Sequence, residues 1–360
     1  MQGDTDKSIG EIYRSGRLAI VGSGIAAVAH LTLETIGYIQ GADVVFYHVN
    51  SGVTAAYVQE LNANAVDLYE FYGEGKLRNI TYVQMAELML REVRRGRSVV
   101  GLFHGHPGYF VKAGRRALAI AEMEGYETVL LPGISATDCL FSDLRIDPGV
   151  IGVQILKASH VLRKDVSLTT DNHVVLVQIG SVGDNTFSFT GYKHTKFDRL
   201  FDRLISIYGE EHDSVYYVAP IFPGLDPVIR ERRLGEYRLQ EALDTVHAAT
   251  LYLPPAGVRV HSLKALQAFH NKAPYGRFEL DAIEALDTHN TPAGFKRRGA
   301  SKPMLRAMVE LGTSPVAART FRRNPDEFFA RHCDLNNQER EALLSRETGL
   351  MRSVTTEVQR

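Results

Sequence analysis

The chain has 360 residues, of which 44% are hydrophobic and 23% charged, a composition typical of globular proteins rather than of disordered or fibrous ones. The 41 Lys and Arg residues are balanced by 42 Asp and Glu residues, so the excess of positive charge on which nucleic-acid binding depends is absent. Two cysteines, Cys139 and Cys333, exclude a disulfide framework, and the polar N-terminus and the lack of any apolar run of about 18 residues favour a soluble, cytoplasmic protein.

The first half of the chain alternates short apolar runs with helical patterns. Apolar runs bounded by glycine predict buried strands, and apolar residues three and four apart predict amphipathic helices. The predicted strands are residues 18–21, 43–49, 99–103 and 128–131, and the predicted helices are residues 81–95, 115–124 and a stretch after Gly24 that ends near Gly37. This alternation predicts a mostly parallel, open α/β sheet, because parallel strands need a crossover between them.

The second half begins with another α/β pattern and ends with helices. Strands are predicted at residues 173–179, 214–219 and 250–253, and a helix at 197–208, so a second α/β lobe is expected. Past Pro254-Pro255 the strand patterns disappear. The chain is therefore expected to continue as an all-helical region.

Several capping signals mark short helices in this last region. A first helix is predicted at residues 262–271, and the later ones are marked by Ser314-Pro315, by Asn324-Pro325 and by the capping-box pair Asn336 and Glu339. The basic run Lys296-Arg297-Arg298 is interpreted as a solvated loop. Such short helices bury little surface alone, so they are expected to pack against the rest of the protein or a partner.

The string GSGIAA at residues 22–27 has the G-x-G-x-x-A spacing of a dinucleotide site at a strand–helix junction. A dinucleotide site also requires an acidic residue at the end of the next strand, but residues 46–50 (FYHVN) contain none. The alternative is a tight turn that only glycine permits. The sequence favours the tight turn over NAD binding.

Three further glycine-containing strings lie at predicted strand ends: GLFHGHPG at 101–108, LPGISA at 131–136 and QIGSVG at 178–183. The carboxyl ends of strands form the ligand crevice of an open α/β sheet, so these loops predict a small molecule bound close to the backbone. Turn chemistry alone is the alternative. His104 and His106 leave a metal site conceivable, although no third ligand with suitable spacing accompanies them.

Together these strings resemble the tetrapyrrole methylase superfamily, whose members bind S-adenosylmethionine between two α/β domains. Residues 67–74 (DLYEFYGE), Arg78, residues 81–85 (TYVQM) and the GLFHGHPG string are similar to the omphalotin-type borosin methyltransferases, which methylate backbone amide nitrogens of ribosomally made peptides. The similarity covers roughly residues 18–255. It implies S-adenosylmethionine as cofactor, S-adenosylhomocysteine as product, and no metal.

The resemblance also implies which residues hold the cofactor. They follow the strand ends and comprise His104, His106, Pro107, Gly108, Tyr109, Phe110, Ser135, Ala136, Gln178, Ala219 and Thr250. His104 departs from the family pattern, which has a tyrosine there. The contact with the methyl donor at this position is therefore the least certain to carry over.

The implied reaction requires a base and a positive charge. A peptide nitrogen is a poor nucleophile because its lone pair is delocalised into the carbonyl, and removing the N–H proton yields a nucleophilic imidate. Carried over from the family, Tyr72 or Tyr82 is the base, Arg78 stabilises the imidate oxygen and Tyr69 is a supporting donor. A nearby guanidinium is expected to lower a phenol pKa. Taken singly, each tyrosine would be a packed aromatic side chain and Arg78 a surface charge.

The expected fold class is therefore α/β, with two tetrapyrrole-methylase-like lobes of open sheets followed by an all-helical clasp and a leader-like module. The predicted divisions are an N-terminal extension (1–16), the methyltransferase (17–256), a helical dimerisation clasp (257–300), a leader-like module (301–350) and a tail (351–360). Resemblance implies an interlocked homodimer in which the clasp wraps the partner. The apolar residues Leu263, Leu266 and Phe269 are compatible with burial there.

The tail is the predicted substrate, methylated by its own chain or by the dimer partner. The candidate residues are Ser353, Val354, Thr355, Thr356, Glu357 and Val358, of which 354–358 form an apolar and β-branched stretch. A separate precursor peptide is one alternative, and a tail that only supports the dimer is another. Outside this family, the alternatives are a methyltransferase for tetrapyrroles or other small molecules and a binding module without turnover.

Overall fold

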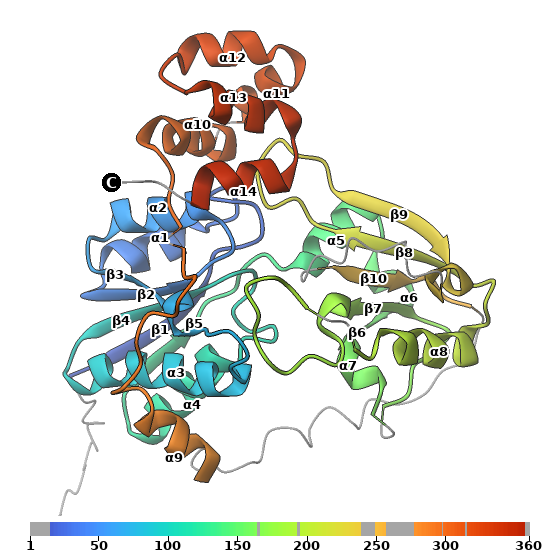
Figure 1. The fold of residues 1–360 in the computed structure, drawn as a ribbon, viewed down its shortest axis with the longest axis horizontal. Helices are drawn as coiled ribbons and strands as arrows, with labels where there is room; N and C mark the ends of the chain where they lie inside the picture. The colour runs from blue at the N-terminus through green and yellow to red at the C-terminus, as the bar shows by residue number, and fades with distance from the viewer. Residues whose placement is uncertain are drawn as a thin grey trace, which may run out of the picture.

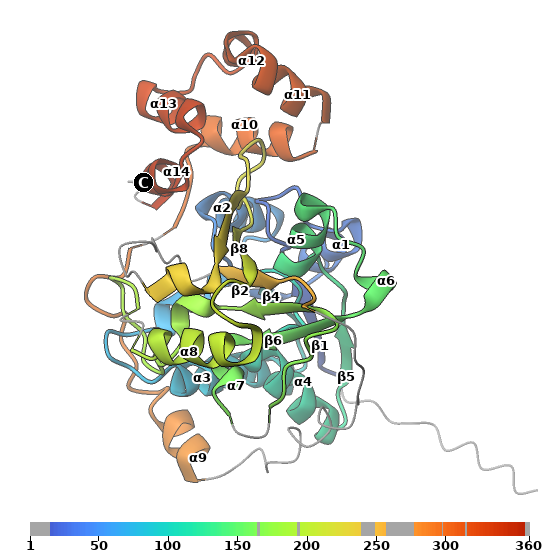
Figure 2. The same ribbon diagram turned by 90° about the vertical axis from the view of Figure 1, so that its right-hand side faces the viewer.

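The computed structural model describes residues 15–163, 166–192, 195–238, 249–256, 277–296, 298–313 and 315–356. Two sheets lie side by side, each with helices packed against it, and a group of short helices covers one end of the first lobe (Figure 1). The turned view shows this helical group standing on the first lobe, at the opposite end from helix α9 (Figure 2). None of the helices in the described part of the chain is long and apolar enough to cross a membrane.

The first sheet is entirely parallel, as the sequence predicts. Its five strands have the order β3-β2-β4-β1-β5. They are β1 (Arg17–Gly22), β2 (Val44–His48), β3 (Ala65–Asp67), β4 (Ser98–Phe103) and β5 (Glu127–Leu130). Successive side chains of β1 point to opposite faces, and both faces are covered, which explains why the central strands read as continuous apolar runs.

Two pairs of helices cover the two faces of this sheet. They are α1 (Leu33–Gln40) and α2 (Gly52–Leu61) on one face and α3 (Arg78–Arg94) and α4 (Lys112–Met123) on the other (Figure 1). Helix α1 begins later than predicted, because residues 25–31 form turns and the Thr32 side chain caps the helix by accepting from the Thr35 amide at 3.0 Å.

The second sheet is mixed rather than parallel. Its strand order is β6-β7-β10-β8-β9, and only β6 and β7 run parallel. The strands are β6 (Val153–Lys157), β7 (His173–Val177), β8 (Asp213–Val218), β9 (Val228–Arg233) and β10 (Thr250–Leu253). Sequence analysis missed β6 and β9. Strand β9 is an exposed edge strand rich in charges, so it lacks the apolar pattern of a half-buried strand.

Shorter elements complete the second lobe and the connection to it. The predicted helix at 197–208 is confirmed as α8 (Phe197–Tyr208), whose apolar face packs on β7 and β10. The remaining elements are α5 (Ala136–Leu144), α6 (Pro148–Ile151), α7 (Ala158–Val161) and the 3₁₀ helices η1 (Leu68–Phe71), η2 (Ile179–Ser181) and η3 (Leu234–Arg238).

The C-terminal region is helical, as predicted. It contains α9 (Arg277–Glu284), α10 (Lys302–Thr313), α11 (Pro315–Arg323), α12 (Pro325–Arg331), α13 (Asn337–Ser345) and α14 (Thr348–Thr356). Asn324 caps α12, and Asn336 forms a capping box with Glu339. The helix predicted at 262–271, with Leu263, Leu266 and Phe269, lies outside the described residues. The buried Met304 and Met308 join α10 to a core shared with both lobes.

Candidate active site

The glycine loops that follow β1 and β4 pack directly on one another. Because the two strands are parallel with Gly22 beside Phe103, their carboxyl ends lie at the same edge of the sheet. The Gly105 amide donates to the Gly24 carbonyl at 2.9 Å, and the Gly24 amide donates back at 3.3 Å. The loops that follow β1 and β4 therefore share one edge of the sheet.

The G-x-G-x-x-A string forms a tight turn and does not present a phosphate cradle. The amides of Ile25 and Ala26 point at the Nδ1 atom of His30, at 3.3 and 3.1 Å. A Cβ on Gly22 would lie 2.3 Å from the Gly105 carbonyl oxygen, so this glycine is required for close packing. Because these amides already donate to His30 within the chain, the structure favours a tight turn over a dinucleotide site.

Replacing Gly22 by alanine is expected to force the two loops apart. The added methyl group would also meet Pro107 Cδ at 2.8 Å, and neither neighbour is a flexible side-chain end. We expect the free energy of unfolding to fall by about 1–3 kcal/mol and cofactor affinity to fall with it. Chemical denaturation and calorimetric titration measure the two effects. Gly37→Ala is the matched control, since nothing lies within 4 Å of its Cβ position; equal losses in both variants would contradict the loop argument.

The loop at residues 106–110 exposes aromatic side chains beside a fixed histidine. The Gly108 amide donates to His106 Nδ1 at 2.9 Å, and the His106 and Tyr109 rings lie 4.8 Å apart. Tyr109 is 45% and Phe110 43% exposed, and Phe110 has a left-handed backbone with φ of 58°. Within the described residues, no group of three or more His, Cys, Asp or Glu side chains could hold a metal ion.

The loop before α5 lies against the same glycine loop. A Cβ on Gly133 would lie 3.1 Å from the Gly105 carbonyl oxygen, so residues 131–136 approach residues 104–108 closely. Ser135 caps α5, and its amide donates to Asp138 Oδ2 at 2.6 Å. The structure thus brings Ser135 and Ala136 to the edge where the His106 loop lies.

The three predicted cofactor residues of the second lobe gather at one edge of its sheet. Gln178 follows β7 and Ala219 follows β8, while Thr250 begins β10, which is antiparallel to both. The Ile179 amide donates to the Ala249 carbonyl at 3.1 Å, which ties the end of β7 to the start of β10. The Ala27 amide donates to the Ile221 carbonyl at 2.8 Å and joins this edge to the first lobe.

The structure brings together the four residues predicted to be catalytic. Tyr69 lies in η1, Tyr72 directly follows it, and Arg78 and Tyr82 lie in the first turns of α3. The Tyr72 ring centroid lies 5.5 Å from that of Tyr69 and 6.4 Å from that of Tyr82. The expectation of unrelated packed aromatics and a surface arginine is not supported, since Arg78 is only 8% exposed.

A loop of the second lobe completes this cluster with residues that sequence analysis missed. Arg78 donates to the Tyr192 hydroxyl at 3.3 Å and to the Asp184 carbonyl, and its guanidinium carbon lies 5.0 Å from the Tyr192 ring centroid. The Phe187 ring stacks on Tyr72 at 4.4 Å. Within the described residues, Arg78 is held by these contacts and forms no ion pair with a carboxylate.

Burial dominates the protonation of the tyrosine cluster. The pKa of Tyr72 is raised well above its ordinary value, first by burial and then by Tyr82, whereas Arg78 lowers it by less. Burial likewise raises the pKa of Tyr192 to about 12. Arg78 thus lowers the pKa of the Tyr72 phenol as expected, but the net pKa is raised, because desolvation outweighs the neighbouring charge.

The segment between α9 and α10 runs across the first lobe (Figure 1), and two of its residues contact η1. His289 Nε2 lies 2.8 Å from the Glu70 carbonyl oxygen, and the guanidinium carbon of Arg298 lies 4.0 Å from the Tyr69 ring centroid. Arg298 also donates to the Val49 carbonyl. The interpretation of residues 296–298 as a solvated loop is therefore wrong for Arg298, which stacks on a predicted catalytic tyrosine.

His104, at the position where the family pattern has tyrosine, lies beside this cluster. Its amide donates to the His48 carbonyl at 3.0 Å, and the His48 and Tyr69 rings lie 6.1 Å apart. Burial lowers the pKa of His104 to about 4, with further contributions from the charges of Arg298 and Arg352. The imidazole is therefore neutral at physiological pH.

This pKa shift predicts a pH-dependent stability difference. Since the folded-state pKa lies below the unfolded value of 6.5, the unfolded chain binds the proton more tightly. The contribution of neutral His104 to the free energy of unfolding is complete above pH 6.5 and is lost as the pH falls toward 4. We expect His104→Tyr to lose less stability than the parent chain between pH 7 and pH 5, measured by urea unfolding. Parallel losses in the two proteins would contradict the assignment.

The predicted substrate residues lie at the end of helix α14. Ser353, Val354, Thr355 and Thr356 are helical, and Glu357 and Val358 lie outside the described residues. Thr355 is buried, and its carbonyl accepts from the Gly299 amide at 3.0 Å. Helical amides are used in main-chain hydrogen bonds, so methylation at residues 353–356 requires α14 to unwind.

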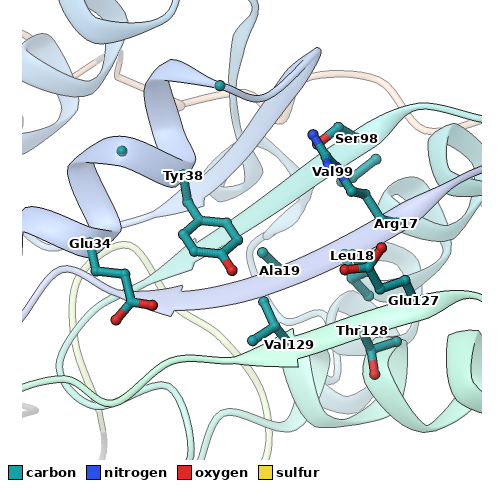
Figure 3. A pocket seen from close by; sticks show the side chains of 12 residues that line it. Arg17, Leu18, Ala19, Glu34, Tyr38, Ser98, Val99, Glu127, Thr128 and Val129 are labelled. Atoms are coloured by element: carbon teal, nitrogen blue, oxygen red, sulfur yellow. The ribbon is translucent and has the colours of Figure 1, made fainter.

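A separate cavity of about 440 Å³ lies at the other edge of the first sheet (Figure 3). Its walls come from the beginnings of β1, β4 and β5 and from α1, and include Arg17, Tyr38, Ser98 and Glu127. None of the predicted site residues lines it. The strand-end site is therefore distinct from this cavity.

Two family models match the chain. The model of the tetrapyrrole (corrin/porphyrin) methylases matches residues 17–220, and that of the borosin biosynthesis clasp domain matches residues 274–360. The first match covers the first lobe and most of the second. The second covers helices α9 to α14.

Fungal methyltransferases that are also precursors of ribosomally synthesized cyclic peptides are similar over nearly the whole chain. A type III borosin precursor of Anomoporia bombycina is 40% identical over 95% of this chain and 43% of that protein. The lentinulin A precursor of Lentinula edodes is 39% identical over 92% of this chain and 86% of that protein. The omphalotin A precursor of Omphalotus olearius is 40% identical over 92% of this chain and 85% of that protein.

The chain thus spans less than half of the Anomoporia protein and about six-sevenths of the other two. Its lobes match the methylase model, and its helical end matches the clasp model. The chain is a methyltransferase with a tetrapyrrole-methylase fold, and it belongs to the borosin family.

Proposed function

We propose that this protein transfers the methyl group of S-adenosylmethionine to backbone amide nitrogens of a ribosomally made peptide. The observation that carries this proposal is the convergence of Tyr69, Tyr72, Arg78 and Tyr82 where the two lobes meet. Relatives named as cyclic peptide precursors, and the clasp match, support a peptide rather than a tetrapyrrole as substrate.

The residues at the facing edges of the lobes fit this methyl donor. The side-chain amide of Gln178 and the hydroxyl of Thr250 make no hydrogen bond within the described part of the chain, although Thr250 is only 1% exposed. Both are therefore available to polar atoms of a ligand, and the exposed Tyr109 and Phe110 offer aromatic surface. His104, His106 to Phe110, Ser135, Ala136, Gln178, Ala219 and Thr250 are the residues proposed to hold it.

The donor supplies an electrophilic methyl group and leaves as S-adenosylhomocysteine. Tyr72 or Tyr82, reacting as the phenolate, takes the proton from the peptide N–H and becomes a neutral phenol, and the electron pair left on nitrogen is delocalised onto the carbonyl oxygen. Arg78 stabilises that oxygen, and Tyr69 supports it as a second donor. The nitrogen then forms its bond to the methyl carbon, so neutralisation of the imidate accompanies neutralisation of the donor's positive charge.

We propose the chain's own C-terminal peptide, or that of a dimer partner, as the substrate. The names of the relatives join methyltransferase and precursor in one protein, which supports a substrate on the same chain. Because residues 353–356 are helical, the methylated amides belong to a segment that leaves α14 or lies beyond it. A separate precursor peptide remains the alternative. The interlocked homodimer remains a prediction.

The proposal is tested by incubating the purified chain with S-adenosylmethionine and measuring its intact mass. Gains of one methyl mass, located on backbone nitrogens by tandem mass spectrometry, are expected. Turnover on an added peptide with no change in the chain would select the separate-precursor alternative. Binding of S-adenosylhomocysteine without methylation of the chain or of any added peptide would overturn the proposed activity.

A further inference from the structure

Lys157 is a positively charged residue at the active-site edge that has no role in the scheme above. It is the last residue of β6 and lies beside Val177, directly before Gln178, in the parallel register of β6 and β7. The same edge of the second sheet carries the proposed cofactor residues Gln178 and Thr250. Its ammonium therefore belongs to the region where the two lobes meet.

Lys157 lies close to two other cations from the first lobe. Arg78 begins α3 and Lys112 begins α4, and Lys112 Nζ donates to the side chain of Asn79 at 2.9 Å. The charges of Arg78 and Lys112 both act on Lys157, and burial lowers the pKa of Lys157 to about 8. The cluster thus joins the beginnings of two helices of the first lobe to the end of a strand of the second lobe.

Lys157 makes no hydrogen bond or ion pair within the described residues. A partly buried ammonium loses hydration, and proximity to two like charges costs further free energy. Buried charges in proteins are normally paired, so an arrangement of this kind favours an anion as ligand. The amino-acid end of the methyl donor carries a carboxylate, and an acidic residue of a peptide substrate would carry the same group.

We propose that Lys157, in the field of Arg78 and Lys112, binds a carboxylate of a ligand in the active-site cleft. The carboxylate comes either from the amino-acid end of the methyl donor or from an acidic residue of the peptide substrate. The proposal rests on the proposed function, since that function supplies both ligands. Lys157 is then a determinant of affinity or peptide selectivity, and not a group that acts on the reacting amide.

The test compares binding by the parent chain, Lys157→Met and Lys157→Arg. Lys302→Met, at an exposed position of helix α10, is the control. The first arm titrates S-adenosylhomocysteine and 5′-methylthioadenosine, which lacks the amino-acid end. If the donor supplies the carboxylate, Lys157→Met weakens S-adenosylhomocysteine binding about tenfold and leaves methylthioadenosine binding unchanged. Lys157→Arg is expected to retain most of the affinity, and the control all of it.

The second arm measures KM for paired peptides that carry Glu or Gln beside the methylated residue. If the peptide supplies the carboxylate, Lys157→Met raises KM about tenfold for the Glu peptide only, with S-adenosylhomocysteine binding unchanged. Unchanged binding together with an unchanged Glu-to-Gln preference would overturn the inference, as would a loss of kcat alone. Failure of the parent chain to bind S-adenosylhomocysteine would instead count against the proposed function.

Discussion

Arg78→Ala is expected to lower kcat for peptide methylation by about 10³-fold, because it removes the cation at the oxygen where negative charge develops. Arg78 is buried and held by the Tyr192 hydroxyl and the Asp184 carbonyl, so its guanidinium is oriented before substrate arrives. A preoriented donor loses little free energy to reorganisation in the transition state, which is why its loss appears in kcat. Single-turnover kinetics with mass detection measure the effect.

Two controls separate this catalytic role from a structural one. Arg78→Lys keeps the positive charge but lacks the planar fork of donors, so we expect it to recover only part of the rate. S-adenosylhomocysteine affinity is expected to stay within about twofold in Arg78→Lys, which keeps the positive charge that acts on Lys157, since the hydrogen bonds of Arg78 go to Tyr192 and Asp184 and not to the proposed cofactor residues. An alanine variant that folds, binds S-adenosylhomocysteine and methylates at the parental rate would exclude Arg78 from the chemistry.

Tyr82→Phe is expected to lower the methylation rate by at least about 10²-fold, and Tyr72→Phe by less. Burial raises the pKa of Tyr72 most, and the neighbouring Tyr82 raises it further. Both effects favour the protonated form of Tyr72. A phenol held protonated in this way is a poor base, so the structure favours Tyr82 for proton removal.

The matched pair of phenylalanine variants tests this order directly. Both substitutions keep the ring and remove one hydroxyl, so the packing of the Tyr72 ring on Phe187 is retained. Single-turnover rates of the two variants are compared at the same pH, and Tyr82→Phe is expected to be the slower one. If Tyr72→Phe is the variant with the larger loss, the proton is taken by Tyr72 and the assignment must be reversed.

The sequence predicted the first lobe well because its signals are local. Continuous apolar runs followed by glycine strings identified β1, β2, β4 and β5, and the wide apolar stripe of residues 81–95 identified α3. Periodicity failed for β9, whose exposed charges carry no alternation, and for the start of α1, where residues 25–31 form turns. Edge strands and irregular turns are fixed by their neighbours and leave a weak local pattern.

The residue types of the candidate site were also present in the sequence, through the tyrosines and arginine between residues 69 and 82. The sequence did not show how these residues are arranged in space. Tyr192, Lys157 and Arg298 join the cluster from parts of the chain roughly 75 to 220 residues away from it, and no periodic signal links such distant positions. Their roles depend on which loops the packing of the two lobes and the helical end places side by side.

By itself, the sequence determined the order of elements, the glycine loops at the strand ends and the groups able to do the chemistry. Only the tertiary structure decided that an amide of the G-x-G-x-x-A string donates a hydrogen bond to His30. The same holds for the helical conformation of residues 353–356 and for the stacking of Arg298 on the Tyr69 ring. It also decided that the pKa of Tyr72 rises rather than falls. The physical reason is that strand and helix patterns depend on residues close together in the sequence. The desolvation and the nearby charges that shift a pKa depend on atoms brought together from the whole chain.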